Sequence, residues 1–77
     1  MGRVLFGEAT RGETSKLQTI LHDANIPYFF TEVGHKYSEM RAALEVLSNS
    51  NILPIMVDEG VTYIGFESIR KHCGKIS

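Results

Sequence analysis

Two apolar runs near the start of the chain enclose a stretch whose apolar residues follow a helical spacing. The first run, Val4-Leu5-Phe6, is closed by Gly7, and the second, residues 27–33, is rich in aromatic and β-branched residues. Such runs predict strands, and the stretch between them predicts a helix. A helix that links two strands in this way makes the strands parallel, through a right-handed crossover. The chain is therefore expected to form an α/β sheet with helices packed on it.

The helix between these strands has a start signal and a stop signal. Thr10-Arg11-Gly12-Glu13 has the form of a capping box, in which the side chains of Thr10 and Glu13 each accept from the other residue's backbone amide. Asn25 suits a left-handed residue just after a helix, and Pro27 cannot continue one. The apolar face of the expected helix consists of Leu17, Ile20, Leu21 and Ala24.

A second amphipathic helix is expected after Ser38, which suits its N-cap. Two short strands follow, residues 54–57 and 61–64, and the loop Asp58-Glu59-Gly60 between them suits a hairpin. A last helix is expected to stop at Gly74. The apolar positions are Met40, Ala43, Leu44 and Leu47 in the second helix, and Phe66, Ile69 and Cys73 in the last.

The composition describes one small globular domain, residues 1–77. The chain carries 8 Lys and Arg against 9 Asp and Glu, and 43% of its residues are apolar. Nucleic acid is not expected as a partner, because phosphate binding needs clustered positive charge. No apolar run approaches the length of a membrane span or of a signal-peptide core, so a cytoplasmic location without a membrane partner is expected.

The order strand-helix-strand-helix-strand-strand-helix, together with three short motifs, resembles the glutaredoxin family over nearly the whole chain. The motifs are Asn25-Ile26-Pro27-Tyr28, Ile52-Leu53-Pro54 and Ile64-Gly65-Phe66-Glu67-Ser68. The resemblance implies a thioredoxin-like fold: a four-stranded mixed sheet flanked by three helices, with the strands ordered second, first, third, fourth. It also implies a cis peptide bond between Leu53 and Pro54.

The chain departs from the family at the start of the first helix, where glutaredoxins carry Cys-x-x-Cys. The corresponding residues here are Arg11-Gly12-Glu13-Thr14, and Cys73 is the one cysteine of the chain. Dithiol exchange needs an attacking thiolate and a second thiol at a helix N-terminus. We therefore expect a non-catalytic glutaredoxin-like protein that binds a peptide, a thiol compound or a protein partner. The alternative is a glutathione-dependent thiol-disulfide oxidoreductase that uses Cys73 as a single thiol.

No resident cofactor or metal is expected, although the resemblance allows glutathione as a ligand. The tripeptide would lie between the two helix N-termini and the backbone before Pro54, where Glu13 and Glu67 also place two carboxylates. His22, His35 and His72 lack the spacing of a metal site and are expected at the surface. The candidate ligand-binding residues are Arg11, Thr14, Leu53, Pro54, Gly65, Phe66, Glu67 and Ser68.

Overall fold

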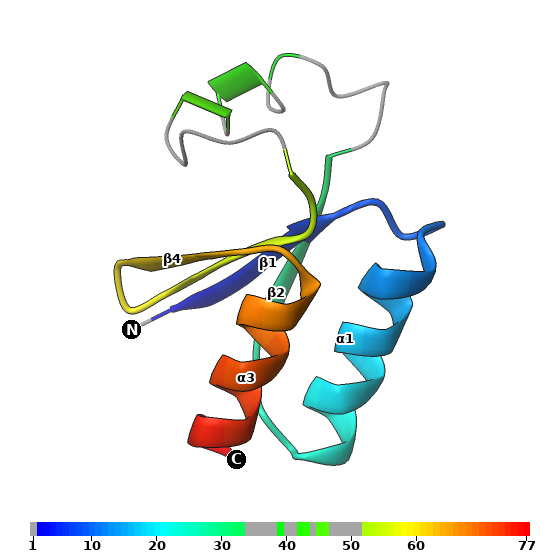
Figure 1. Ribbon diagram of the computed structural model, residues 1–77, viewed down its shortest axis with the longest axis vertical. Helices are drawn as coiled ribbons and strands as arrows, with labels where there is room; N and C mark the ends of the chain where they lie inside the picture. Colours follow the sequence, from blue (N-terminus) through cyan, green and yellow to red (C-terminus); the bar gives the residue numbers. More distant parts are fainter. Residues whose placement is uncertain (1, 34–38, 40–41, 44, 47–51) are drawn as a thin grey trace.

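A computed structural model describes residues 2–33, 39, 42–43, 45–46 and 52–77 of the chain. These residues form one four-stranded mixed sheet and two helices of defined bounds (Figure 1). In chain order the elements are β1 (Arg3–Gly7), α1 (Gly12–Asp23), β2 (Phe29–Glu32), β3 (Ile55–Asp58), β4 (Val61–Ile64) and α3 (Phe66–Ile76).

The strands lie in the order β2-β1-β3-β4. β1 pairs with β2 in parallel and with β3 in antiparallel orientation, and β3 and β4 form an antiparallel hairpin. This order is the one implied by the glutaredoxin resemblance. It places the end of β1, the start of β3 and the end of β4 at the same end of the sheet.

Both helices lie on one face of the sheet, side by side (Figure 1). Side chains alternate between the two faces of a strand, so every second residue of β1 and β3 faces the helices. Leu5 of β1 and Met56 of β3 are fully buried in this way. The core cluster that joins the sheet to both helices consists of Leu5, Leu17, Leu21, Ile26, Met56, Ile69 and Cys73.

A second, smaller cluster lies at the end of the sheet where the candidate site was expected. Val33, Leu53 and Ile55 are buried there, and Phe6 and Ile64 pack against them. This packing holds the segment before Pro54 against the ends of β1 and β4. The backbone at this end of the sheet is therefore anchored by apolar contacts.

Two turns follow the chemistry of their residues. Asn25, with a φ of 57°, is the left-handed residue expected just after α1. In the hairpin, Glu59 and Gly60 have φ values of 51° and 81°, as a two-residue type I′ turn requires. The hairpin loop therefore has two residues and not the three that were expected, because Asp58 belongs to β3.

The expected capping box at Thr10 is wrong. The N-cap of α1 is Arg11, and no side chain of the described residues caps this helix. The chain turns immediately before it: the Arg11 amide donates to the Glu8 carbonyl at 2.9 Å, and the Arg11 carbonyl then accepts from Ser15 at 3.1 Å. That turn moves the start of the helix past Thr10.

Gly74 does not end the last helix, since α3 continues to Ile76. A glycine costs a helix interior only about 1 kcal/mol relative to alanine, which packing of the helix face outweighs.

The helix expected after Ser38 lies largely outside the described residues, so the described part has two helices of defined bounds where three were expected. Within that part, no helix is long and apolar enough to cross a membrane.

Candidate functional site

Pro54 lies where three segments distant in sequence converge. The Gly65 amide, at the start of α3, donates to the Pro54 carbonyl at 2.9 Å. On the other side, a Cβ placed on Gly7 would lie 3.6 Å from Pro54 Cβ and 2.8 Å from Thr14 Oγ1. The first turn of α1, the residues before β3 and the first residues of α3 therefore meet around Pro54.

The Leu53–Pro54 peptide bond is cis, the geometry implied by the glutaredoxin resemblance. Both side chains are buried, and Leu53 is only 5% exposed. Gly65 has a φ of 88°, in the left-handed region that favours glycine. A glycine is thus required where β4 turns into α3.

The N-terminus of α1 presents a cation at this end of the sheet. Arg11 has extended backbone angles, and its side chain is 49% exposed. Its Nε lies 3.3 Å from Oε1 of the half-buried Glu8, and the Arg11 side chain itself stays exposed. No described side chain caps α1, so its first backbone amides lack a side-chain acceptor among the described residues.

The N-terminus of α3 likewise lacks a side-chain cap among the described residues, and its N-cap residue is Gly65. Glu67 instead pairs with Arg70 on the same helix, with Oε1 at 2.7 Å from Nη2 and 3.1 Å from Nε. These hydrogen bonds from Arg70, assisted by its charge, lower the pKa of the Glu67 carboxyl. The carboxylate therefore faces along α3 and leaves the first amides of the helix uncapped.

The eight expected site residues differ in what they offer a ligand. Thr14 is fully buried against Gly7, and its Oγ1 has no hydrogen-bond partner among the described residues. Its side chain is therefore covered by the protein in this structure, and a role for Thr14 in ligand binding stays a prediction. Leu53 and Pro54 are buried as well, Gly65 and Phe66 are half-buried, and Arg11, Glu67 and Ser68 are exposed.

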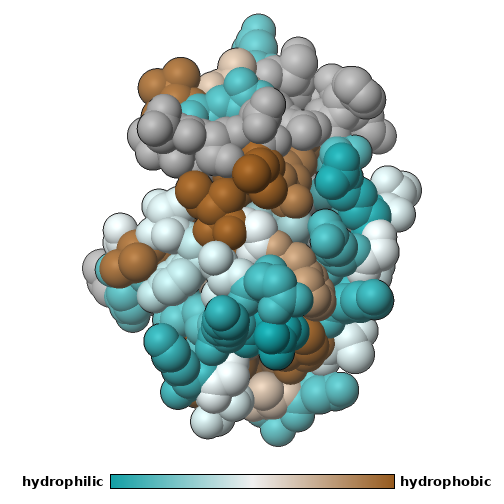
Figure 2. All heavy atoms as spheres, viewed as in Figure 1, coloured by the Kyte–Doolittle hydropathy of each residue, from teal (hydrophilic) through white to brown (hydrophobic). Residues whose placement is uncertain are grey.

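An exposed apolar side chain flanks the site. Ile52 is 56% exposed, and its Cγ2 lies 3.9 Å from a Cβ placed on Gly65. Figure 2 shows apolar side chains gathered where β4 leads into α3, with polar side chains over much of the outer surface of the two helices. Sequence reasoning did not include Ile52 among the site residues.

Cys73 lies away from this site. It belongs to the core cluster between α3 and the sheet and is 1% exposed. Burial raises the pKa of its thiol; the charge of Arg3 opposes this rise and that of Asp58 adds to it. A buried, protonated thiol is a poor nucleophile.

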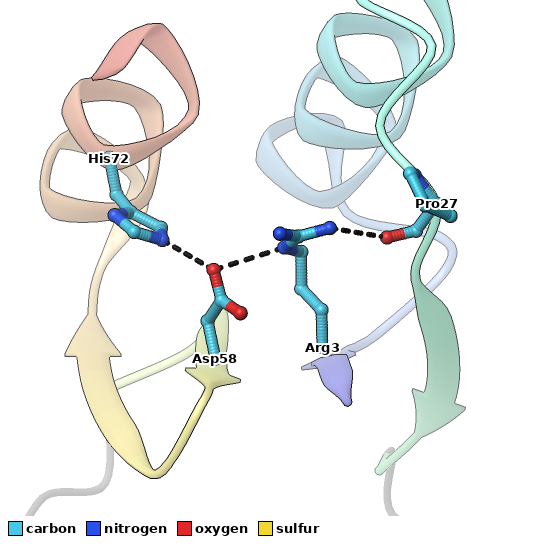
Figure 3. A network of polar contacts seen from close by, with 4 residues as sticks. All are labelled: Arg3, Pro27, Asp58 and His72. Carbon is cyan, nitrogen blue, oxygen red and sulfur yellow. Dashed lines mark hydrogen bonds and ion pairs between the residues drawn. The ribbon is translucent and has the colours of Figure 1, made fainter. Parts of the chain in front are cut away.

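A buried polar network at the other end of β1 was missed by the sequence analysis (Figure 3). Asp58 Oδ2 accepts from Arg3 Nε at 3.0 Å and lies 2.6 Å from His72 Nε2, while Arg3 Nη1 donates to the Pro27 carbonyl at 2.7 Å. His72 also stacks on Tyr63, with ring centroids 3.9 Å apart. The expectation of a surface position for His72 is wrong, because its side chain is 13% exposed.

Opposing effects act on the Asp58 carboxyl. Burial raises its pKa, but the hydrogen bonds from His72 and Arg3, together with the Arg3 charge, outweigh burial and lower it overall. Asp58 is therefore a carboxylate near neutral pH. Among the described residues, no group of three His, Cys, Asp or Glu side chains is arranged to hold a metal ion.

The fold is that of the glutaredoxins. The chain superposes on a glutaredoxin from Archaeoglobus fulgidus with a TM-score of 0.72 and 12% identity, over 90% of this chain and 82% of that one. It superposes on buckwheat glutaredoxin, in a complex with glutathione, with a TM-score of 0.77 and 18% identity, over 97% of this chain and 81% of that one. No protein-family model and no curated protein matches its sequence. The chain is thus a glutaredoxin-like protein with a thioredoxin fold.

Proposed function

We propose that this glutaredoxin-like chain binds an anionic thiol peptide, such as glutathione or a similar segment of a protein partner, without exchanging disulfides. The observation that carries the proposal is the convergence of two uncapped helix N-termini, those of α1 and α3, on the backbone around Pro54. Unpaired amides at helix N-termini attract carboxylates through hydrogen bonds and the helix dipole. Glutathione carries two carboxylates, one for each helix.

Two further observations support an anionic ligand. Arg11 holds an exposed guanidinium at the N-terminus of α1, suited to a charge-assisted bond with one carboxylate. At α3, Glu67 pairs with Arg70 and does not cap the first amides of the helix. The buckwheat glutaredoxin of similar fold is recorded in a complex with glutathione.

The chemistry of the chain argues against dithiol exchange. Arg11 and Thr14 occupy the positions that correspond to the two cysteines, and neither supplies a thiol. The alternative, a monothiol oxidoreductase, would have to use Cys73, which is buried in the core and has a raised pKa. Binding is therefore the function that the geometry supports best, and the cytoplasmic location stays a prediction.

Titration of the isotope-labelled chain with glutathione, followed by amide chemical shifts, tests the proposal. We expect saturable shifts at residues 11–14, at Leu53 and at residues 65–68. Arg11→Ala should weaken binding about threefold to tenfold, because a charge-assisted hydrogen bond is lost. Lys16→Ala removes an exposed cation further along α1 and should leave the affinity unchanged. Absence of shifts in these segments at millimolar glutathione would refute binding at this site.

Turnover of a mixed disulfide of glutathione separates binding from catalysis. We expect no turnover above the uncatalysed rate for the intact chain. Robust turnover that Cys73→Ser abolishes would instead establish the monothiol activity. This assay does not depend on the outcome of the titration, because a protein can bind glutathione without reducing it.

A further inference from the structure

β4 forms one edge of the sheet, and half of its backbone groups point away from β3. The Gly65 amide, directly after β4, donates to the Pro54 carbonyl at 2.9 Å and so points toward the β3 side. Alternate residues of an antiparallel strand bond to the same neighbour, so Thr62 and Ile64 direct their amides and carbonyls outward. Neither residue has a hydrogen bond to any described residue at this edge.

The side chains of β4 leave the edge accessible and uncharged. Val61 is 52% exposed, and Thr62 is exposed as well. Natural sheets protect an open edge strand with a charged side chain, a proline or a bulge. The four residues of β4 include neither a charged residue nor a proline, and the register with β3 runs without a bulge. The backbone of β4 is thus available to another strand.

The other edge of the sheet, β2, is protected. The Val33 amide donates to the Gly7 carbonyl at 3.0 Å, so Phe30 and Glu32 are the residues of β2 that point away from β1. Glu32 brings a carboxylate to this edge, where its Oε1 accepts from the Ala9 amide at 2.9 Å. A charge at an outward position opposes pairing with a further strand. The two edges therefore differ, and β4 is the one suited to pairing.

We propose that β4 pairs in antiparallel orientation with β4 of a second copy of this chain, which joins the two four-stranded sheets into one. Such pairing is symmetric about a two-fold axis, so the same residues serve both copies. With the axis at Tyr63, Thr62 of each copy lies opposite Ile64 of the other. Each of these two pairs exchanges two backbone hydrogen bonds, so every outward amide and carbonyl of β4 gains a partner.

This register also brings uncharged side chains together on both faces of the joined sheet. Tyr63 lies on the helix side, where its ring stacks on His72 with centroids 3.9 Å apart. Across the axis it meets Tyr63 of the second copy, and the exposed Val61 lies diagonally beside that ring. On the opposite face, Thr62 and Ile64 form a β-branched cross-strand pair, which favours strand pairing.

A second copy fits this edge better than a strand of another protein, because the edge carries no charge that would select a foreign partner. The acids that flank β4 along the chain are Glu59 and Glu67, and Glu67 is already paired with Arg70. Pairing of two such short strands buries less than the roughly 1,200 Å2 of a stable interface, so the dimer is weak and transient. It also closes at two copies, because the remaining β2 edges are protected.

Sedimentation equilibrium and amide shifts of the labelled chain, both measured over a range of protein concentrations, test the pairing. We expect a monomer–dimer equilibrium with a Kd of roughly 0.1–1 mM and concentration-dependent shifts centred on residues 61–65. A mixed sample of ¹³C-labelled and unlabelled chain then identifies the register. An isotope-filtered NOE should connect the Hα atoms of Tyr63 in the two copies, because residues of a non-hydrogen-bonded pair lie closest across the strands.

Two lysine substitutions of equal charge locate the interface. Thr62→Lys places a cation at the outward position in both copies and should weaken dimerisation at least about tenfold. Thr19→Lys adds the same charge at an exposed threonine of α1 and should leave dimerisation unchanged. The NOE uses the native chain, so it decides the matter even if a variant fails to fold.

Four results would overturn the proposal. They are a monomer at about 2 mM protein, equal dimerisation of Thr62→Lys and the native chain, equal weakening by the two lysine variants, and concentration-dependent shifts in β2 instead of β4. Loss of dimerisation in Thr62→Lys alone, together with the NOE at Tyr63, would establish the paired edge.

Discussion

Asp58 and His72 are joined by a 2.6 Å contact between Oδ2 and Nε2, which ties the last residue of β3 to the second turn of α3. The same carboxylate accepts from Arg3 of β1 at 3.0 Å. A single buried side chain thus connects two strands and a helix. It lies at the far end of the sheet from the candidate binding site and contributes to the stability of the frame that holds α3.

Asp58→Asn should lower the free energy of unfolding by about 2–4 kcal/mol, because it removes one partner of a buried, charge-assisted network and leaves Arg3 without its counter-charge. Urea denaturation of both proteins measures this difference. Asp23→Asn, at an exposed aspartate, is the control and should change the free energy by less than about 0.5 kcal/mol. Equal effects of the two substitutions would show that the network does not stabilise the fold.

The contribution of Asp58 should depend on pH in a defined direction. Its folded-state pKa lies below the ordinary value of an aspartate, about 4, because the contacts with His72 and Arg3 outweigh burial. Its ionisation therefore stabilises the fold above about pH 4, and this stabilisation is lost as the pH falls through the folded-state pKa. The stability difference between the native chain and Asp58→Asn should shrink as urea midpoints are taken from pH 7 down to pH 2. A difference that grows toward acid pH would contradict the assignment.

Gly7→Ala should destabilise the chain by about 1–3 kcal/mol. The added Cβ would lie 2.8 Å from Thr14 Oγ1 and 3.1 Å from Thr14 Cγ2, both closer than packing allows. Thr14→Ala removes both atoms, so a double-mutant cycle should show a favourable coupling between the two substitutions. Gly12→Ala, where nothing lies within 4 Å, is the control and should be neutral or stabilising in α1.

Cys73 should react with a disulfide reagent only when the chain unfolds. The thiol is 1% exposed, and burial raises its pKa, so it is neither accessible nor ionised in the folded state. The labelling rate, followed by absorbance, should rise with urea in parallel with unfolding. Rapid stoichiometric labelling in native buffer would show that the thiol is reachable and would restore the monothiol alternative.

Several elements of the fold could be predicted from sequence because their signals are local. β4 has the bounds that its β-branched residues and flanking glycines indicate, and Asn25 is left-handed because its side chain tolerates that conformation. The start of α1 could not be predicted, because the turn from Glu8 to Arg11 competes with the capping box at Thr10. Two local signals of similar strength cannot be ranked without the rest of the molecule.

The candidate site was located by its resemblance to glutaredoxins, and the exposure of its residues was decided by packing. Arg11 and Thr14 are three positions apart at the start of α1, yet Arg11 is exposed and Thr14 is fully buried against Gly7. Thr14 faces the end of β1, whereas Arg11 remains outside the helix as its N-cap. Which hydroxyl or cation a ligand can reach therefore depends on the position of α1 over the sheet.

The sequence by itself determined the order of the four strands and of the first and last helices, the hairpin and the absence of a pair of thiols, because periodicity, turn residues and residue identity are properties of short segments. Only the tertiary structure decided that Arg3, Asp58 and His72 form one network. Arg3 and Asp58 are 55 positions apart and meet through the register of β1 and β3, and His72 reaches them because α3 packs on the same face of the sheet. Such contacts depend on the free energy of the whole packed chain, which short-range patterns do not contain.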